Sequence, residues 1–411
     1  MSARAAAPAP GKRRWPNLAL FLVAMALLSA AGGMFETTFN NFVSDVHHLQ
    51  AAARGALEFP RELPGFLTAL LLAALVFLAE TRVAAAAAAA TGLGMLGLAW
   101  AGGSWGSMMV ALTVWSVGAH LIMPVRSSIG MDLAEGGLRG RRLGQISGVS
   151  VAASIVGCGL VWLLMRGGGR DYRLVFTLAG AGSLAAATVL LAMRLPGAHV
   201  ARPRFVWNNR YWLYYVLSFL FGARKQIFIT FGPWVLIKVF HQPAVIFAQL
   251  WIVAGLLGVL FQPALGRAID HFGERRVLVA DALVILGVCL GYGCAHRLGQ
   301  AGAALGLLYA CFVLDQLFFG TGMARDIYLS KIAARKEDVA PTLSLGVSIN
   351  HAVSMSVPAL GGWLWMRHGH DKVFLAAAAV ALVMLFFACR VPDLRSAPGR
   401  APCRPSGFRA Q

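Results

Sequence analysis

The chain has 411 residues, of which 58% are hydrophobic and only 13% are charged, and it contains 46 glycines. A soluble domain of this size does not need so much apolar residue, so the composition excludes an ordinary soluble protein. The net charge of +19 is spread as short basic clusters between apolar runs, which indicates a multi-pass protein in a lipid bilayer and no nucleic-acid partner.

The apolar runs predict twelve transmembrane helices, because about 20 predominantly apolar residues are enough to cross a bilayer. The first run follows Lys12, Arg13 and Arg14 as a secretory signal would, but the many later spans favour a first transmembrane helix. An even number of spans places both chain ends on one side of the membrane. The predicted limits are 17–44, 58–79, 83–102, 107–130, 144–166, 173–193, 211–238, 244–265, 277–295, 302–324, 341–366 and 371–390.

The distribution of basic residues identifies the side on which the chain ends lie. Lys and Arg are concentrated in the N-terminal arm (1–16), the tail (391–411) and the loops after the even-numbered spans. With Arg126, Arg325 and Arg390 at their edges, these segments hold 25 of the 36 Lys and Arg residues. Because loops rich in Lys and Arg stay inside, we predict a protein of the cell (inner or plasma) membrane with both termini cytoplasmic. The tail is rich in Arg, Pro and Ala, so we expect it to be disordered.

The two halves of the chain resemble each other, which favours a duplicated six-helix unit. Three matches follow in order at nearly constant offset: Trp162-Leu163-x-Met165-Arg166 with Trp363-Leu364-x-Met366-Arg367, Gly148-Val149-Ser150 with Gly346-Val347-Ser348, and Gly33, Glu36, Phe39 and Phe42 with Gly222, Lys225, Phe228 and Phe231. The predicted fold is an all-α polytopic membrane protein of two pseudo-symmetric six-helix bundles, 17–193 and 211–390, joined by a cytoplasmic linker over 194–210. Duplicated halves with a site at their interface are a common plan among transporters.

Arg224 and Lys225 stand side by side in the middle of the span 211–238. Each cation costs about 2.5–3.5 kcal/mol at mid-membrane, so an acidic partner, a water-filled cavity or an anionic solute must compensate it. Glu36 occupies the repeat position of Lys225 in the first span. We therefore expect Glu36 to pair with Arg224 or Lys225 in one conformation, and to be able to carry a coupling proton; the alternative is a permanent structural ion pair between the halves.

Other polar residues inside the predicted spans complete a predicted substrate and proton cavity. Asp315 is a second candidate for the proton site, because a carboxylate inside a span is costly. A helix-packing role is the simpler interpretation for each histidine of this set. The candidates for solute contact are Asn40, Asn350, His351 and His120.

The start of the second predicted span carries charges at spacings of three and four, which place them on one helical face. This charged face either lines the cavity or forms a helical extension outside the membrane. The residues are Arg54, Glu58, Arg61 and Glu62.

The loop between the eighth and ninth spans reads Gly266-Arg267-Ala268-Ile269-Asp270-His271-Phe272-Gly273-Glu274-Arg275-Arg276. It resembles the G-x-x-x-D-x-x-G-x-R-R cytoplasmic-loop signature of the major facilitator superfamily, and the resemblance covers about residues 15–390. It implies that the glycines form a tight turn and that the loop latches the cytoplasmic face. The implied latch residues are Gly266, Arg267, Asp270, Gly273, Arg275 and Arg276, with Arg126, Asp132, Arg325 and Asp326 as candidate partners at the ends of the fourth and tenth spans. The equivalent first-half loop, with Glu80 and Arg82, is shorter and lacks the glycines.

The resemblance implies a secondary transporter in which two bundles rock about a central site, and we expect it to be proton-coupled. Arg224 and Lys225 favour an anionic or carboxylate-bearing solute, because fixed cations in a low-dielectric cavity attract anions. Export of amphipathic drugs or metabolites, and a non-transporting solute sensor of the same fold, are the alternatives. The sequence has no nucleotide-binding loop, no catalytic cluster and no metal-type cysteine spacing, so we predict no enzyme activity, cofactor or metal site. The expected partners are a small-molecule solute, a coupling proton and the lipid bilayer, and we expect the protein to be a monomer.

Overall fold

The computed structural model describes residues 14–75, 77–134, 138–195, 207–335 and 338–393. Within these ranges the chain forms helices joined by short connections and contains no strand. Most of the predicted arm (1–16), linker (194–210) and tail (391–411) lies outside the described residues, so the predicted disorder of the tail stays a prediction.

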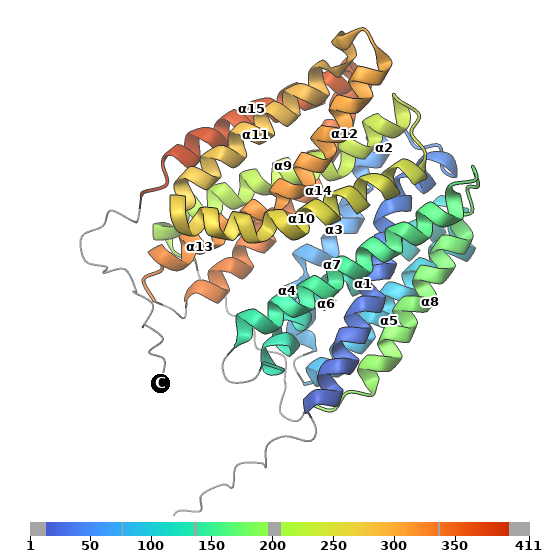
Figure 1. Ribbon diagram of the computed structural model, residues 1–411, viewed down its shortest axis with the longest axis vertical. Helices are drawn as coiled ribbons and strands as arrows, with labels where there is room; N and C mark the ends of the chain where they lie inside the picture. Colours follow the sequence, from blue (N-terminus) through green and yellow to red (C-terminus); the bar gives the residue numbers. More distant parts are fainter. Residues whose placement is uncertain (1–13, 76, 135–137, 196–206, 336–337, 394–411) are drawn as a thin grey trace, which may run out of the picture.

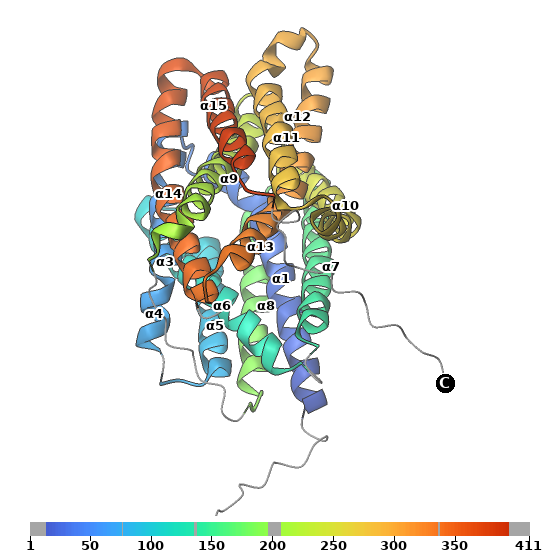
Figure 2. The ribbon, with the colours of Figure 1, turned by 90° about the vertical axis from the view of Figure 1, so that its left-hand side faces the viewer.

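The described helices form two groups that follow each other in the sequence. The first group comprises α1 (Arg14–Asp45), α2 (Ala51–Ala56), α3 (Glu58–Phe66), α4 (Thr68–Ala74), α5 (Glu80–Ala101), α6 (Trp105–Asp132), α7 (Arg139–Met165) and α8 (Tyr172–Leu191). The second comprises α9 (Trp212–Lys238), α10 (Ala244–Phe272), α11 (Glu274–Cys294), α12 (Ala301–Phe318), α13 (Gly322–Ile332), α14 (Val339–His368) and α15 (His370–Cys389), with short 3-10 turns at Asn209–Tyr211, Ala295–Leu298 and Phe319–Thr321. Figure 1 shows the first group in blue to green and the second in yellow-green to red, and Figure 2 shows the two groups from the side.

Ten helices among the described residues are long and apolar enough to cross a membrane. The prediction of an all-helical, polytopic membrane protein is confirmed, although ten and not twelve helices in these ranges have the length and apolar composition of a membrane span. One of the two remaining predicted spans is α9, whose middle carries Arg224, Lys225 and Gln226. The other was predicted as one helix over 58–79, and this was wrong, because that stretch is divided between α3 and α4. Pro64 lies inside α3 and lacks the N–H that would bond to the preceding turn, and its own carbonyl oxygen accepts a hydrogen bond from the Thr68 hydroxyl at 2.9 Å, a contact that often bends helices.

The apolar core differs between the two ends of the molecule. Away from the start of α1, one core is shared by both groups and includes Phe35 and Trp115 from the first and Phe231 and Trp234 from the second. Near the start of α1 and the end of α15, each group has a separate core. The two groups are therefore packed together at the far end, and each keeps its own core at the end where the described chain begins and ends.

Small residues allow the close approach of the two groups at the far end. A Cβ added at Gly55 of α2 would collide with the backbone of Pro358 in α14, and one added at Gly362 would collide with the backbone of Ala51. Small residues at helix interfaces are typical of membrane proteins, because they let backbones come into contact. The Asn41 side chain of α1 also donates a hydrogen bond to the carbonyl oxygen of Gln242, 3.0 Å away, at the start of the second group.

Candidate functional site: a charged network between the two helix groups

Glu36 lies on α1 and lines an open cavity of about 270 Å³ between α1, α7 and α10. Its side chain is 40% exposed, and its Oε1 lies 3.4 Å from an NH2 nitrogen of Arg61. The sequence predicted Arg224 or Lys225 as its partner in one conformation; in the conformation described here the partner is Arg61, and the predicted pairing stays a prediction. The physical reason is that α3 packs against both α6 and α14, which brings Arg61 from the same half of the chain to the Glu36 carboxylate.

The buried centre of the network is formed by Arg54 and Glu58, whose side chains are 0% exposed and in direct contact. Arg61 lies 3.1 Å from the Oε1 atom of Glu58. Neighbouring helices supply further hydrogen bonds: Asn40 Oδ1 of α1 accepts from Arg54 Nε at 3.0 Å, and Gln226 Nε2 of α9 donates to Glu58 Oε2 at 2.6 Å. These residues are therefore buried against α1 and α9, which favours the interpretation that they belong to the interior of the protein.

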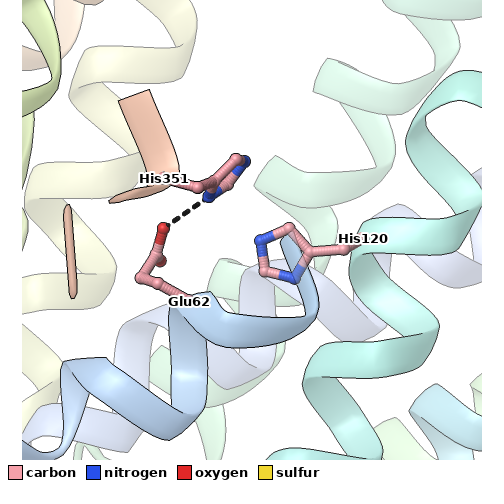
Figure 3. A group of neighbouring side chains, drawn as sticks. All are labelled: Glu62, His120 and His351. Atoms are coloured by element: carbon pink, nitrogen blue, oxygen red, sulfur yellow. Dashed lines mark hydrogen bonds and ion pairs between the residues drawn. The ribbon is translucent and has the colours of Figure 1, made fainter. Parts of the chain in front are cut away.

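Glu62 connects the same network to the second helix group. Its Oε2 accepts a hydrogen bond from His351 Nδ1 of α14 at 2.8 Å and lies 3.8 Å from Lys225 Nζ of α9. Figure 3 shows His120 of α6 beside this pair, with one ring nitrogen directed towards it. The His120 and His351 rings stand edge to face with centroids 4.9 Å apart, so three of the predicted cavity residues meet at Glu62.

Arg224 points away from this network into its own helix group. Its guanidinium lies 3.1 Å from the Asp315 carboxylate of α12, and the two side chains are 2% and 5% exposed. Successive residues of an α-helix project about 100° apart, since the helix has about 3.6 residues per turn. Lys225 therefore faces the first group and Arg224 does not, although both were predicted to face one shared cavity.

The ionic charges of this network balance. Arg54, Arg61 and Lys225 supply three cations, and Glu36, Glu58 and Glu62 supply three carboxylates. Arg224 and Asp315 form a separate pair, and the buried carboxylate of Asp281 in α11 is close enough to interact electrostatically with both. Each of the two mid-membrane cations thus has an acidic partner, which compensates a large part of its desolvation cost.

Asn350, the remaining predicted contact, is 9% exposed on α14. A Cβ added at Gly222 of α9 would lie 3.0 Å from the Asn350 Cα, so Asn350 stands where these two helices approach each other closely. Its position is therefore beside the network and within the second helix group.

The predicted latch loop is the turn between α10 and α11. Gly273 has a φ of +84° and a ψ of 163°, a conformation that is essentially restricted to glycine. Gly266 lies inside α10 and takes no part in the turn, so the prediction that both glycines shape it was wrong for Gly266. The four charged residues of the motif, Arg267, Asp270, Arg275 and Arg276, are exposed.

The predicted latch partners are placed differently from the expectation. Arg325 and Asp326 of α13 contact each other at 3.2 Å. Arg126 is half-buried near the C-terminal end of α6. The contact that ties the turn to α13 is one that the motif did not indicate, between Glu274 and Lys331, 2.5 Å apart. The sequence feature that could have indicated this contact is the acidic residue at the first position of a helix, directly after the glycine turn.

The first half has an acidic residue in the same place. Glu80 begins α5 as Glu274 begins α11, it is buried, and it accepts a hydrogen bond from the Ser128 hydroxyl of α6 at 2.8 Å. Arg82, two residues later, is exposed. The shorter first-half loop therefore keeps the anchoring carboxylate even though it lacks the glycines.

Comparison with known proteins identifies the family. A model described as Major Facilitator Superfamily matches residues 61–334, more than half of the chain. Solved structures with the same fold include the nucleoside transporter NupG (TM-score 0.72, 15% identity, covering 91% of this chain and 99% of that one) and a D-xylose–proton symporter (0.71, 14%, 92% and 98%). A bacterial homologue of the human lysosomal transporter Spinster, in an inward-facing and occupied conformation, is similar to the same degree (0.71, 14%, 93% and 98%), whereas the curated protein sequences gave no match. The chain therefore belongs to the Major Facilitator Superfamily, and it is a multi-pass membrane transporter.

Proposed function

We propose that the protein is a proton-coupled secondary transporter that moves a small solute by alternating access, and that Glu36 takes up the coupling proton. The observation that supports this proposal is that Glu36 belongs to the charged network and is also accessible from the cavity. Among the described residues of the charged network it is the carboxylate that also lines the cavity between α1, α7 and α10. A proton arriving through the cavity therefore reaches Glu36 before it reaches the fully buried Glu58.

Protonation of Glu36 would change the forces that hold the two helix groups together. The balanced network would lose one negative charge, and Arg61 would keep Glu58 as its acidic partner. Glu58 and Glu62 also contact Gln226 and Lys225 of α9, so the charge change reaches contacts that cross between the groups. Protonation of Glu36 can therefore change the relative position of the two helix groups.

The groups around Glu36 support a polar solute that is neutral or carries a cationic group. The cavity wall offers the Glu36 carboxylate, the hydroxyls of Ser150 and Ser154, and the indole ring of Trp251. Carboxylates and indole faces both attract cations. An anionic solute, which the sequence favoured because of Arg224 and Lys225, would have to replace Asp315 or Glu62 as the partner of a cation.

The charge distribution along the loops supports a location in the cell membrane with both termini cytoplasmic. In that orientation the end with separate cores faces the cytoplasm, so this conformation is inward-facing. The protein works as a monomer in this proposal. The rival functions, drug or metabolite export and solute sensing, are separated from it by vesicle experiments, since a sensor binds solute without flux.

Replacing Glu36 with glutamine is expected to abolish solute accumulation driven by a pH gradient and to spare solute counterflow. Glutamine keeps the size and polarity of the side chain but cannot exchange a proton. Accumulation and counterflow are measured in vesicles containing the purified protein, with the solute first identified by a thermal-shift screen of amines, sugars, amino acids, acids and drugs.

The matched control for this substitution is Asp371→Asn, which removes a carboxylate that pairs with its exposed neighbour Lys372 at the start of α15. This variant should accumulate solute as the wild type does, because an exposed ion pair contributes little. Loss of counterflow together with accumulation in Glu36→Gln would remove Glu36 from the coupling role.

Replacing Asp270 with asparagine is expected to slow conformational cycling several-fold and to leave solute affinity unchanged. Asp270 is exposed at the end of α10 in this conformation, and we propose that it forms its latch contact only when the cytoplasmic ends come together. Single-turnover flux in vesicles reports the cycling rate, and solute titration reports the affinity. A change in affinity at an unchanged rate would place Asp270 in the binding site and would contradict its latch role.

A further inference from the structure

Three side chains that can bind a metal ion meet where the two helix groups touch. Glu62 comes from α3, His120 from α6 and His351 from α14, and one ligand atom from each lies within 4.8 Å of the others. Figure 3 shows the carboxylate and the two rings converging on one point. The sequence predicted no metal site because these residues lie far apart in the chain and follow no ligand spacing.

The hydrogen bonds of His120 leave one of its ring nitrogens available. Its Nδ1 lies 2.9 Å from the backbone oxygen of Ser116 and 3.0 Å from the Ser116 hydroxyl. A bond from Nδ1–H to a backbone carbonyl fixes the tautomer that has its lone pair on Nε2. Metal-binding histidines are commonly oriented by such a bond from the other ring nitrogen.

Gly65 provides the space that lets the rings approach. It follows Glu62 by one helical turn, and a Cβ at this position would lie 2.6 Å from atoms of both the His120 and the His351 rings. Any other residue at this position would push the two rings apart. The segment thus supplies one ligand, Glu62, and leaves room for the other two.

We propose that Glu62, His120 and His351 bind a divalent transition-metal ion of the Zn²⁺ type, with ligands from both helix groups. Two imidazoles and one carboxylate form a ligand set that suits such ions, and they leave a fourth coordination position open. Lys225 lies 3.8 Å from the Glu62 carboxylate and is the cation that the metal would compete with. The ion therefore replaces an ammonium–carboxylate contact and also the hydrogen bond from His351 Nδ1 to Glu62, and the proton on that nitrogen moves to the other ring nitrogen or to water.

The consequence for transport follows from where the ligands come from. Two are in the first helix group and one is in the second, so a bound ion links the groups in the conformation described here. Micromolar metal is therefore expected to slow the transport cycle. This second step rests on the proposed transport function, whereas metal binding itself does not.

The experiment uses Co²⁺ as the probe, because its visible absorption reports coordination by nitrogen and oxygen ligands. Purified full-length protein without a histidine tag is titrated with Co²⁺ in detergent, and Zn²⁺ is then added to displace it. Visible absorption bands are expected in the wild type. His120→Gln and His351→Gln should each weaken Co²⁺ affinity by about 100-fold or more, since even the loss of an outer partner typically costs 10–100-fold.

Two further variants make the test specific. His368→Gln removes an exposed histidine from α14, the helix that carries His351, and should leave the absorption bands unchanged. Lys225→Met removes the competing cation and should strengthen Co²⁺ binding by about tenfold or more, because unit charges at this separation interact strongly away from water.

Absent bands in the wild type, or bands that persist in both His120→Gln and His351→Gln, would overturn the proposal. Elution volume and thermal unfolding without metal show that each variant is folded, and the gain in Lys225→Met is a positive result that a folding defect cannot imitate. The proposed transport function is tested separately, by the Glu36→Gln flux measurement.

Discussion

Replacing Glu58 with glutamine is expected to destabilise the folded protein by about 3–5 kcal/mol, because it leaves a buried arginine without its counter-ion. Arg54 and Glu58 are both 0% exposed and in contact. Arg61 keeps Glu36 as an acidic partner when the residue at position 58 is neutral, whereas the partners left in contact with Arg54, such as Asn40 and the Phe39 ring, are uncharged. The uncompensated charge on Arg54 is therefore the cause of the lower stability.

The measurement is unfolding of the purified protein in detergent by heat or denaturant, followed by helix signal and by intrinsic fluorescence. The double variant Arg54→Leu with Glu58→Leu should recover part of the stability, because an apolar pair replaces a buried ion pair at little net cost. Asp371→Asn should stay within about 0.5 kcal/mol of the wild type. Wild-type stability in Glu58→Gln would mean that Arg54 is solvated or paired elsewhere in the folded protein.

The overall fold could be predicted because its signals are local or repeated along the chain. Apolar runs of spanning length, basic loops and one glycine turn each depend on neighbouring residues. Gly273 shows this well, since its left-handed φ is a property of a single position beside a helix end. The interruption of the second span was missed, because the apolar residues after Pro64 conceal the change from α3 to α4.

The pairing of charges could not be predicted, because it depends on which side of a helix meets which neighbour. The repeat alignment related Glu36 to Lys225, but equivalent positions in two symmetric halves lie on opposite sides of the symmetry axis and need not touch. Glu36 contacts Arg61 and Lys225 contacts Glu62, so α3 lies between the two expected partners. The three- and four-residue spacing of these charges predicted that they share one face of a helix, but it did not predict where that helix lies.

Replacing Asp315 with asparagine is expected to destabilise the protein by about 3–5 kcal/mol, because Arg224 would be left buried without a carboxylate 3.1 Å away. The double variant Arg224→Met with Asp315→Leu should recover most of this loss, since it removes both charges from an interior position. Thermal unfolding in detergent measures the effect, with the two single variants examined in parallel.

The same double variant decides between the two carboxylates that the sequence offered as proton sites. Asp315 is 5% exposed and is held by Arg224 within the second helix group, whereas Glu36 is 40% exposed at the cavity. If Asp315 has only a structural role, the folded double variant should still accumulate solute under a pH gradient. If this variant is stable and shows counterflow but no accumulation, Asp315 carries the coupling proton, and the assignment of that role to Glu36 is wrong. The position of the two carboxylates favours the first outcome, because a group that must exchange protons with water needs a path to it, and the described cavity reaches Glu36.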